Sequence, residues 1–228
     1  MDKVAPTKGG RGARQRILDT ATELFYRDGI NATGVERLAA ESSVSKRTLY
    51  QHFPSKTAVV EEYLRGIDQR ATRLATDTSD QTPRQRLLAV FDTPKAPTRT
   101  LRGCPFHNAA VEAAGTMPGV HEIVRVSKES FVEALTELAG QAGAADPRQL
   151  GNQLAVLSEG AAALTTSLDD PTPWAWAKTA AEALIDQALA RRASDRQKPL
   201  SRRATIGGAT NLSLGGGHNE RRKPSVAD

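Results

Sequence analysis

The sequence has few of the features that mark several common protein classes. Its 228 residues include one cysteine, Cys104, which excludes an internal disulfide framework and is typical of a reducing compartment. No run of about 18 consecutive apolar residues is present, so no membrane-spanning helix is expected. Residues 1–6 contain no apolar segment after their basic residue and do not resemble a signal peptide. We therefore expect a cytoplasmic protein with no membrane partner.

Residues able to carry out chemistry are scattered along the chain. Neither a Ser–His–Asp arrangement nor a glycine-rich phosphate loop is indicated, and the glycine run 215–217 has the composition of a flexible linker. The Cys-x-x-His spacing of Cys104 and His107, even with Glu112 and His121 as further candidates, is weak evidence for a metal site because no second close pair of ligands accompanies it. The sequence predicts no enzymatic activity, no metal and no cofactor.

Positive charge is concentrated at the two ends of the chain. Residues 1–56 carry 10 lysines and arginines against 6 acidic residues, residues 57–193 carry 14 against 17, and residues 194–228 carry 7 against 3. A basic N-terminal segment followed by a slightly acidic central segment suggests that the N-terminal segment binds phosphate groups. The last segment has too few large apolar residues to offset the entropy of ordering it, so we expect a disordered basic tail.

Apolar residues recur at helical spacing, and no segment alternates with period two over the length of a strand. The predicted fold class is therefore all-α. Capping residues, prolines and glycines divide the pattern into segments. Helices are expected over residues 13–27, 34–41, 46–52, 55–75, 83–91, 105–114, 119–139, 147–168 and 172–192.

Two of these segments, 34–41 and 46–52, are joined by a three-residue turn, as in a helix-turn-helix. The second helix of such a motif enters the DNA major groove, and its leading residues meet base edges. Arg47 lies in that leading turn and is able to pair with guanine. Leu49 and Phe53 are expected to face the core.

The run Val-Ser-Lys-Arg-Thr-Leu-Tyr-Gln-His-Phe-Pro-Ser-Lys at residues 44–56 resembles the signature of the tetracycline-repressor (TetR) family. Residues 16–25 are similar to the first helix of that family and residues 29–39 to the second, so the resemblance covers about residues 14–65. Ser43 is a departure, because the family usually has glycine in this turn. A non-glycine residue in a left-handed conformation costs about 1 kcal/mol.

The resemblance implies a transcriptional regulator, most often a repressor, that binds double-stranded operator DNA as a homodimer and is released by a small-molecule or electrophilic effector. It divides the chain into a flexible arm (1–12), a helix-turn-helix domain (13–54), an effector-binding and dimerisation domain (55–193) and the tail (194–228). An α-helical enzyme and an architectural nucleic-acid binder are the alternatives. The residues expected at DNA are Thr33, Ser45, Lys46, Arg47, Thr48, Tyr50, Gln51, His52 and Lys56.

The last two predicted helices carry apolar and small residues at spacings of three and four. Such seams suit an antiparallel helix pair that two subunits join into a four-helix bundle, and TetR-like proteins dimerise in this way. The alternative is that the seams form only the core of one chain. The residues expected at the interface are Leu150, Leu154, Leu157, Ala161, Leu164, Trp174, Ala177, Ala181 and Leu184.

The segment 101–112 is the candidate wall of the effector pocket. Pro105 suits the first position of a helix, so Cys104 precedes that helix, with Asn108 and Glu112 one and two turns further along the same face. Beside Arg102 and His107, such a thiol suits a sensor of electrophiles or oxidants; the alternative is a small residue that only lines the pocket. We expect an effector to tilt the helix at 55–75. The residues expected at the pocket are Cys104, Phe106, Asn108, Glu112 and Phe131.

Overall fold

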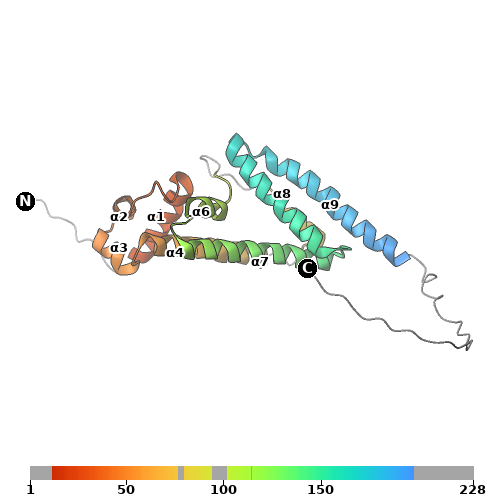
Figure 1. Cartoon of the computed structure of the whole chain (residues 1–228), viewed down its shortest axis with the longest axis horizontal. Coiled ribbons are helices and arrows are strands. Elements are labelled where there is room, and N and C mark those ends of the chain that lie inside the picture. Colours follow the sequence, from red (N-terminus) through yellow and green to blue (C-terminus); the bar gives the residue numbers. More distant parts are fainter. Residues whose placement is uncertain (1–11, 77–79, 94–101, 114, 198–228) are drawn as a thin grey trace, which may run out of the picture.

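The structure is a computed structural model that describes residues 12–76, 80–93, 102–113 and 115–197. These residues form nine helices and no strand, so the all-α prediction is confirmed (Figure 1). None of the described helices is long and apolar enough to cross a membrane. The helices are α1 (Ala13–Asp28), α2 (Val35–Glu41), α3 (Lys46–His52), α4 (Lys56–Thr76), α5 (Pro83–Ala89), α6 (Pro105–Ala113), α7 (Pro118–Ala142), α8 (Pro147–Leu168) and α9 (Thr172–Gln197).

Every predicted helix is present, and most ends fall within one or two residues of the prediction. The largest difference is at α9, which continues to Gln197 where the sequence pattern suggested an end at 192. Residues 194–197 of the predicted tail are therefore helical. The remainder of the tail and residues 1–11 of the arm lie outside the described residues.

Side-chain caps fix the starts of several helices. The Ser45 Oγ accepts a hydrogen bond from the Thr48 N–H at 3.0 Å and begins α3, and the Ser55 Oγ accepts one from the Ala58 N–H at 3.1 Å before α4. Asp146 caps α8 in the same way, and a proline occupies the first turn of that helix. Each cap satisfies a backbone donor that has no partner within the helix.

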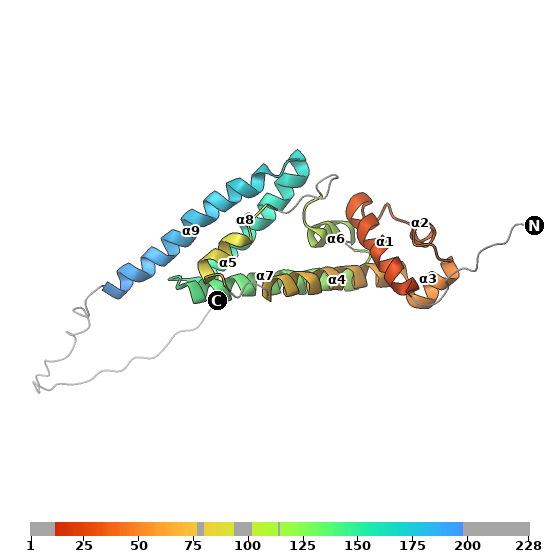
Figure 2. The same cartoon turned by 180° about the vertical axis from the view of Figure 1, so that it is seen from behind.

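The helices enclose two hydrophobic cores. The first lies among α1, α2, α3, α4, α6 and the beginning of α7, and the second among α5, the end of α7, α8 and α9. In Figure 1, α1–α3 cluster at one end of the molecule, and α8 and α9 form a hairpin at the other. Figure 2 shows α5 beside α7 from behind. Helix α7 is buried in both cores, through Val120 and Val124 in the first and Leu135 and Ala139 in the second, and so joins them.

The turn between α2 and α3 has the left-handed conformation that the sequence suggested. Ser43 has a φ of 54°, and its N–H donates to the Ala40 carbonyl at 3.1 Å. The next N–H, of Val44, returns to the Ala39 carbonyl at 3.0 Å. The tight turn that orients α3 is thus built with a serine where glycine would avoid the steric penalty.

We predict that Ser43→Gly raises the free energy of unfolding by up to about 1 kcal/mol, because the left-handed penalty is removed and only part of it is offset by the greater freedom of glycine in the unfolded chain. Gly143→Ser is the matched control with the opposite sign, since Gly143 has a φ of 90° at the end of α7. Urea denaturation of the two variants measures both shifts. A Ser43→Gly variant less stable than the parent would contradict the prediction.

Candidate functional site

The first turn of α3 presents two cations to solvent. Arg47 is exposed, and no hydrogen bond or ion pair joins it to another described residue. Lys46 is exposed as well, and its Nζ lies 2.6 Å from the Glu36 Oε1 of α2. That hydrogen bond lowers the pKa of Glu36 and raises the pKa of Lys46. Because the pair is in solvent it contributes little stability, so a phosphate can displace Glu36 at low cost.

The other residues of the predicted DNA face differ in accessibility. Tyr50 and Gln51 are exposed, whereas Thr48 and His52 are half-buried. The Thr48 hydroxyl lies 2.9 Å from the Ser45 hydroxyl, so these two side chains hold each other at the start of the helix. Lys56 is half-buried at the start of α4, and burial lowers its pKa while the nearby Glu112 opposes that shift.

The inner face of α3 anchors it in the first core. Leu49 is fully buried and Phe53 is 2% exposed, as the sequence predicted. The Arg14 guanidinium stacks over the Phe53 ring at 5.2 Å, and the Arg16 Nε donates to the Ser42 carbonyl at 3.3 Å. Helix α1 therefore holds the residue that follows α2 and the residue that follows α3, which fixes the orientation of the exposed face of α3.

Thr33 has a structural role that sequence reasoning missed. Its side chain is fully buried, and its hydroxyl donates to the Gly29 carbonyl at 2.8 Å. In this position the hydroxyl closes the loop between α1 and α2 and does not face a phosphate. The expected phosphate contact at Thr33 is therefore corrected. The sequence spacing could have indicated this role, because the hydroxyl of a threonine four residues after a helix-ending glycine is placed to donate to that glycine's carbonyl.

A second ion-pair group fixes α2 against α1. The Asp28 Oδ2 lies 2.8 Å from the Arg27 Nη2 and 2.7 Å from the Arg37 Nη2. The hydrogen bond from Arg27, reinforced by that from Arg37, lowers the pKa of Asp28 to about 2. Both arginines are thus engaged within the domain. Arg47 at the tip of α3 stands apart from them as a cation available to a base edge.

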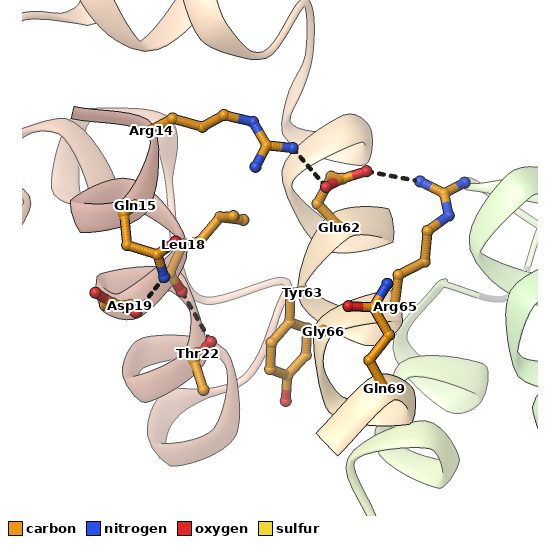
Figure 3. Close-up of a pocket in the computed structure, with 10 residues that line it drawn as sticks. All are labelled: Arg14, Gln15, Leu18, Asp19, Thr22, Glu62, Tyr63, Arg65, Gly66 and Gln69. Carbon is orange, nitrogen blue, oxygen red and sulfur yellow. Dashed lines mark hydrogen bonds and ion pairs between the residues drawn. The ribbon is translucent and has the colours of Figure 1, made fainter. Parts of the chain in front are cut away.

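A polar pocket of about 410 Å³ is lined by residues of α1 and α4 (Figure 3). One ion pair crosses the gap, with the Arg14 Nη2 of α1 2.5 Å from the Glu62 Oε2 of α4. Within α4, the Arg65 Nη1 lies 3.2 Å from the Glu62 Oε1. Figure 3 shows this chain of side chains linking the two helices. None of the residues predicted for an effector lines this pocket.

Helix α6 connects the C-terminal part of the chain to the helix-turn-helix. The Asn31 N–H donates to the Glu112 Oε2 at 2.7 Å, and the Asn31 Nδ2 donates to the Glu112 carbonyl at 2.9 Å. The Arg102 Nη2 lies 3.9 Å from the Glu112 Oε1 and so supports this contact. The loop between α1 and α2 is therefore tied to the last turn of α6. This corrects the expectation that Glu112 lines a pocket: its carboxylate faces the DNA-binding domain.

Two further predicted pocket residues also have other roles. Phe106 is buried in the first core, and the Asn108 Nδ2 donates to the Arg102 carbonyl at 2.7 Å, which stabilises the turn before α6. Cys104 is a free, half-buried thiol, and its Sγ accepts a hydrogen bond from the Lys128 Nζ at 3.3 Å. Among the described residues, no group of three or more metal-ligating side chains converges.

An apolar cavity of about 440 Å³ opens between α6, α7 and α8. Phe131 is the predicted pocket residue that lines it, and Lys128 links the cavity to Cys104. The cavity has the size of a small-molecule site and a lining of mainly apolar side chains. Its lining residues are His107, Ala110, Val124, Lys128, Phe131, Val132, Ala155, Val156 and Glu159.

The residues predicted for a subunit interface fall into two groups. Five are buried within the chain, mostly between α7, α8 and α9: Leu150, Leu154, Ala161, Ala177 and Ala181. Leu157, Trp174 and Leu184 are half-buried, and Leu164 is 47% exposed. The five buried residues already pack within one chain, so a partner reaches this hairpin only through its outer side.

Helix α3, the second helix of the helix-turn-helix, has a buried inner face and an exposed outer face. This arrangement is that of a DNA-binding protein of the regulatory class. A sequence profile described as "Bacterial regulatory proteins, tetR family" matches residues 17–63, and one described as "Tetracyclin repressor-like, C-terminal domain" matches residues 83–181. A TetR-family transcriptional regulator from Streptomyces coelicolor is 32% identical in sequence, with a TM-score of 0.68 over 78% of this chain and 96% of that one. The chain belongs to the TetR family of transcriptional regulators.

Curated relatives match over shorter stretches. The HTH-type transcriptional repressor KstR2 of Rhodococcus jostii is 42% identical over 61 residues, which is 27% of this chain and 30% of that protein. The HTH-type transcriptional activator FasR of Mycolicibacterium smegmatis is 32% identical over 133 residues, or 55% of this chain and 58% of that protein. The chain thus spans less than two thirds of either relative.

We predict that Arg47→Ala weakens binding to the preferred DNA site by about 1–3 kcal/mol and relaxes specificity at one base position, because a base-reading cation is lost. Lys56→Ala is the control and should weaken binding to all sequences more evenly. The preferred site is first selected by the protein from random duplexes, and fluorescence anisotropy then compares it with a scrambled duplex. Equal losses on both duplexes for Arg47→Ala would contradict a base-reading role.

Proposed function

We propose that this protein is a repressor that occupies a palindromic operator as a homodimer and leaves it when a small molecule binds the cavity between α6, α7 and α8. The observation that carries the proposal is the exposed first turn of α3, seated on a buried inner face. Two such helices related by a twofold axis match half-sites about one helical turn apart. Footprinting of one unpaired half-site would contradict the dimeric mode of binding.

The outer face of α8 supports the proposed dimer. Every exposed side chain of α8 between residues 149 and 168 is uncharged. Val156, Leu164 and Leu168 on α8 and Trp176 on α9 are large and exposed. Gly160 has no neighbour within 4 Å of an added Cβ, so a second helix is able to approach closely there. An uncharged face with large exposed apolar side chains and room for close approach is what subunits bury in a four-helix bundle.

We predict that Leu164→Asp dissociates the dimer without unfolding the chain, because Leu164 is 47% exposed in one subunit and the new charge would be buried unpaired only at the interface. Val126→Asp is the matched control: Val126 is equally exposed, at 47%, but lies on α7 beside Arg125 and near Glu129. Sedimentation velocity reports the mass, and circular dichroism reports the fold. A folded Leu164→Asp variant that remains dimeric at micromolar concentration would exclude this face.

Helix α6 supplies the route by which a ligand in the cavity would act on DNA binding. His107 and Ala110 line the cavity, and Glu112 at the end of the same helix holds the backbone of Asn31. A rigid helix that contacts both places moves both together. Helix α7 contacts α4, the helix that an effector is expected from the sequence to tilt, and so offers a second route. An effector releases DNA only if it favours the arrangement of the dimer that binds operator less well.

We predict that Ala110→Phe, which fills the cavity from α6, changes operator affinity by about fivefold or more, and that Glu112→Ala reduces this change to less than about twofold. Val111→Phe is the matched control, because Val111 is on the same helix but 66% exposed. Anisotropy titrations of the single and double variants give the coupling energy. An Ala110→Phe effect of equal size with and without Glu112 would assign transmission to α4 instead.

A further inference from the structure

We infer that the cavity between α6, α7 and α8 selects neutral apolar molecules, and that the Lys128–Glu159 ion pair enforces this selection. The inference rests on the proposed function, since it names the ligand class of the proposed effector cavity. Lys128 comes from α7 and Glu159 from α8, and both line the cavity. Lys128 and Glu159 carry opposite charges, so together they add no net charge to the cavity lining.

The rest of the lining is apolar apart from the imidazole of His107, so it offers a charged ligand few hydrogen bonds. Val124, Phe131 and Val132 on one wall and Ala155 and Val156 on another present aliphatic and aromatic surface. Ligand groups against these walls lose water without gaining a hydrogen bond, which favours apolar groups and disfavours ions. At about 440 Å³, the cavity suits a molecule with up to about three fused or linked rings.

The amine of Lys128 is already engaged. Its Nζ donates to the Glu159 Oε1 in a short ion pair and to the Cys104 Sγ at 3.3 Å. The side chains are 30% and 36% exposed, so the pair is shielded more than the surface pairs of α7. An anion that approaches Lys128 meets the carboxylate of Glu159, and a cation that approaches Glu159 meets Lys128. Like-charge contacts of this kind are a common means of rejecting the wrong partner.

The test uses two fluorescent probes with the same skeleton and different charge. N-phenyl-1-naphthylamine is neutral, and 8-anilinonaphthalene-1-sulfonate carries a sulfonate on that skeleton. Titration of the full chain, without DNA, should show binding of the neutral probe at least about tenfold tighter than the anion. In Glu159→Gln, which frees the amine of Lys128, the preference should fall below about threefold or reverse. In Lys128→Met the anion should bind more weakly than in the parent.

Glu133→Gln is the matched control for removing an ion pair between the same two helices. Glu133 of α7 lies 2.7 Å from Arg148 of α8, and neither residue lines the cavity. This variant should keep the preference of the parent. Ala155→Phe should abolish binding of both probes because it fills the cavity. Thermal unfolding of each variant checks that the fold is retained.

Several outcomes would overturn the inference. Equal or tighter binding of the anion by the parent would show that the cavity does not select against charge, and an unchanged preference in Glu159→Gln would remove the ion pair as its cause. Probe binding that survives Ala155→Phe would place the probes outside this cavity. Probe binding that is lost when the protein dimerises would show that a second copy of the chain covers the cavity. Failure of the neutral probe to release operator DNA, with its binding intact, would contradict the proposed function and leave the selectivity standing.

Discussion

The burial of α7 in both cores is the constraint on which the rest of the arrangement depends. A helix of 25 residues is about 37 Å long, enough to cross from the core beneath the helix-turn-helix to the core inside the α8–α9 hairpin. Because Val120 and Val124 pack in one core and Leu135 and Ala139 in the other, the helix cannot rotate for one core without disturbing the second. Between these anchors its side chains form one wall of the apolar cavity. The cavity is therefore set between two packed bodies.

The helices and their starts were predictable because they depend on local chemistry. Ser45, Ser55 and Asp146 cap the helices that their positions in the sequence indicated, and Ser43 adopts the left-handed turn. These effects involve residues three or four apart, so a single sequence contains all the information they need. The inward direction of Leu49 was predictable for the same reason.

Tertiary partners were harder to predict, because they join residues far apart in the chain. The helical spacing placed Glu112 on one face of α6 with Asn108, but the hydrogen-bond partner of its carboxylate is Asn31, 81 residues away. Thr33 was expected to contact DNA because of the family resemblance. Only the packed loop shows that its hydroxyl donates a hydrogen bond to the Gly29 carbonyl. The seam at Leu150 and Leu154 has a period that suits either an internal helix pair or a subunit interface, and periodicity cannot distinguish them.

The position of Val156 brings the two proposed activities of the C-terminal part together. This residue lies at the wall of the apolar cavity, and it is 72% exposed on the uncharged face of α8. A partner subunit on that face would shield the cavity, which would strengthen the Lys128–Glu159 pair by lowering the local dielectric constant. A ligand in the cavity would in turn press on a residue of the interface. In the proposed dimer the distance between the two α3 helices depends on how the subunits pack, so occupancy of the cavity would be coupled to that distance through the same short stretch of α8.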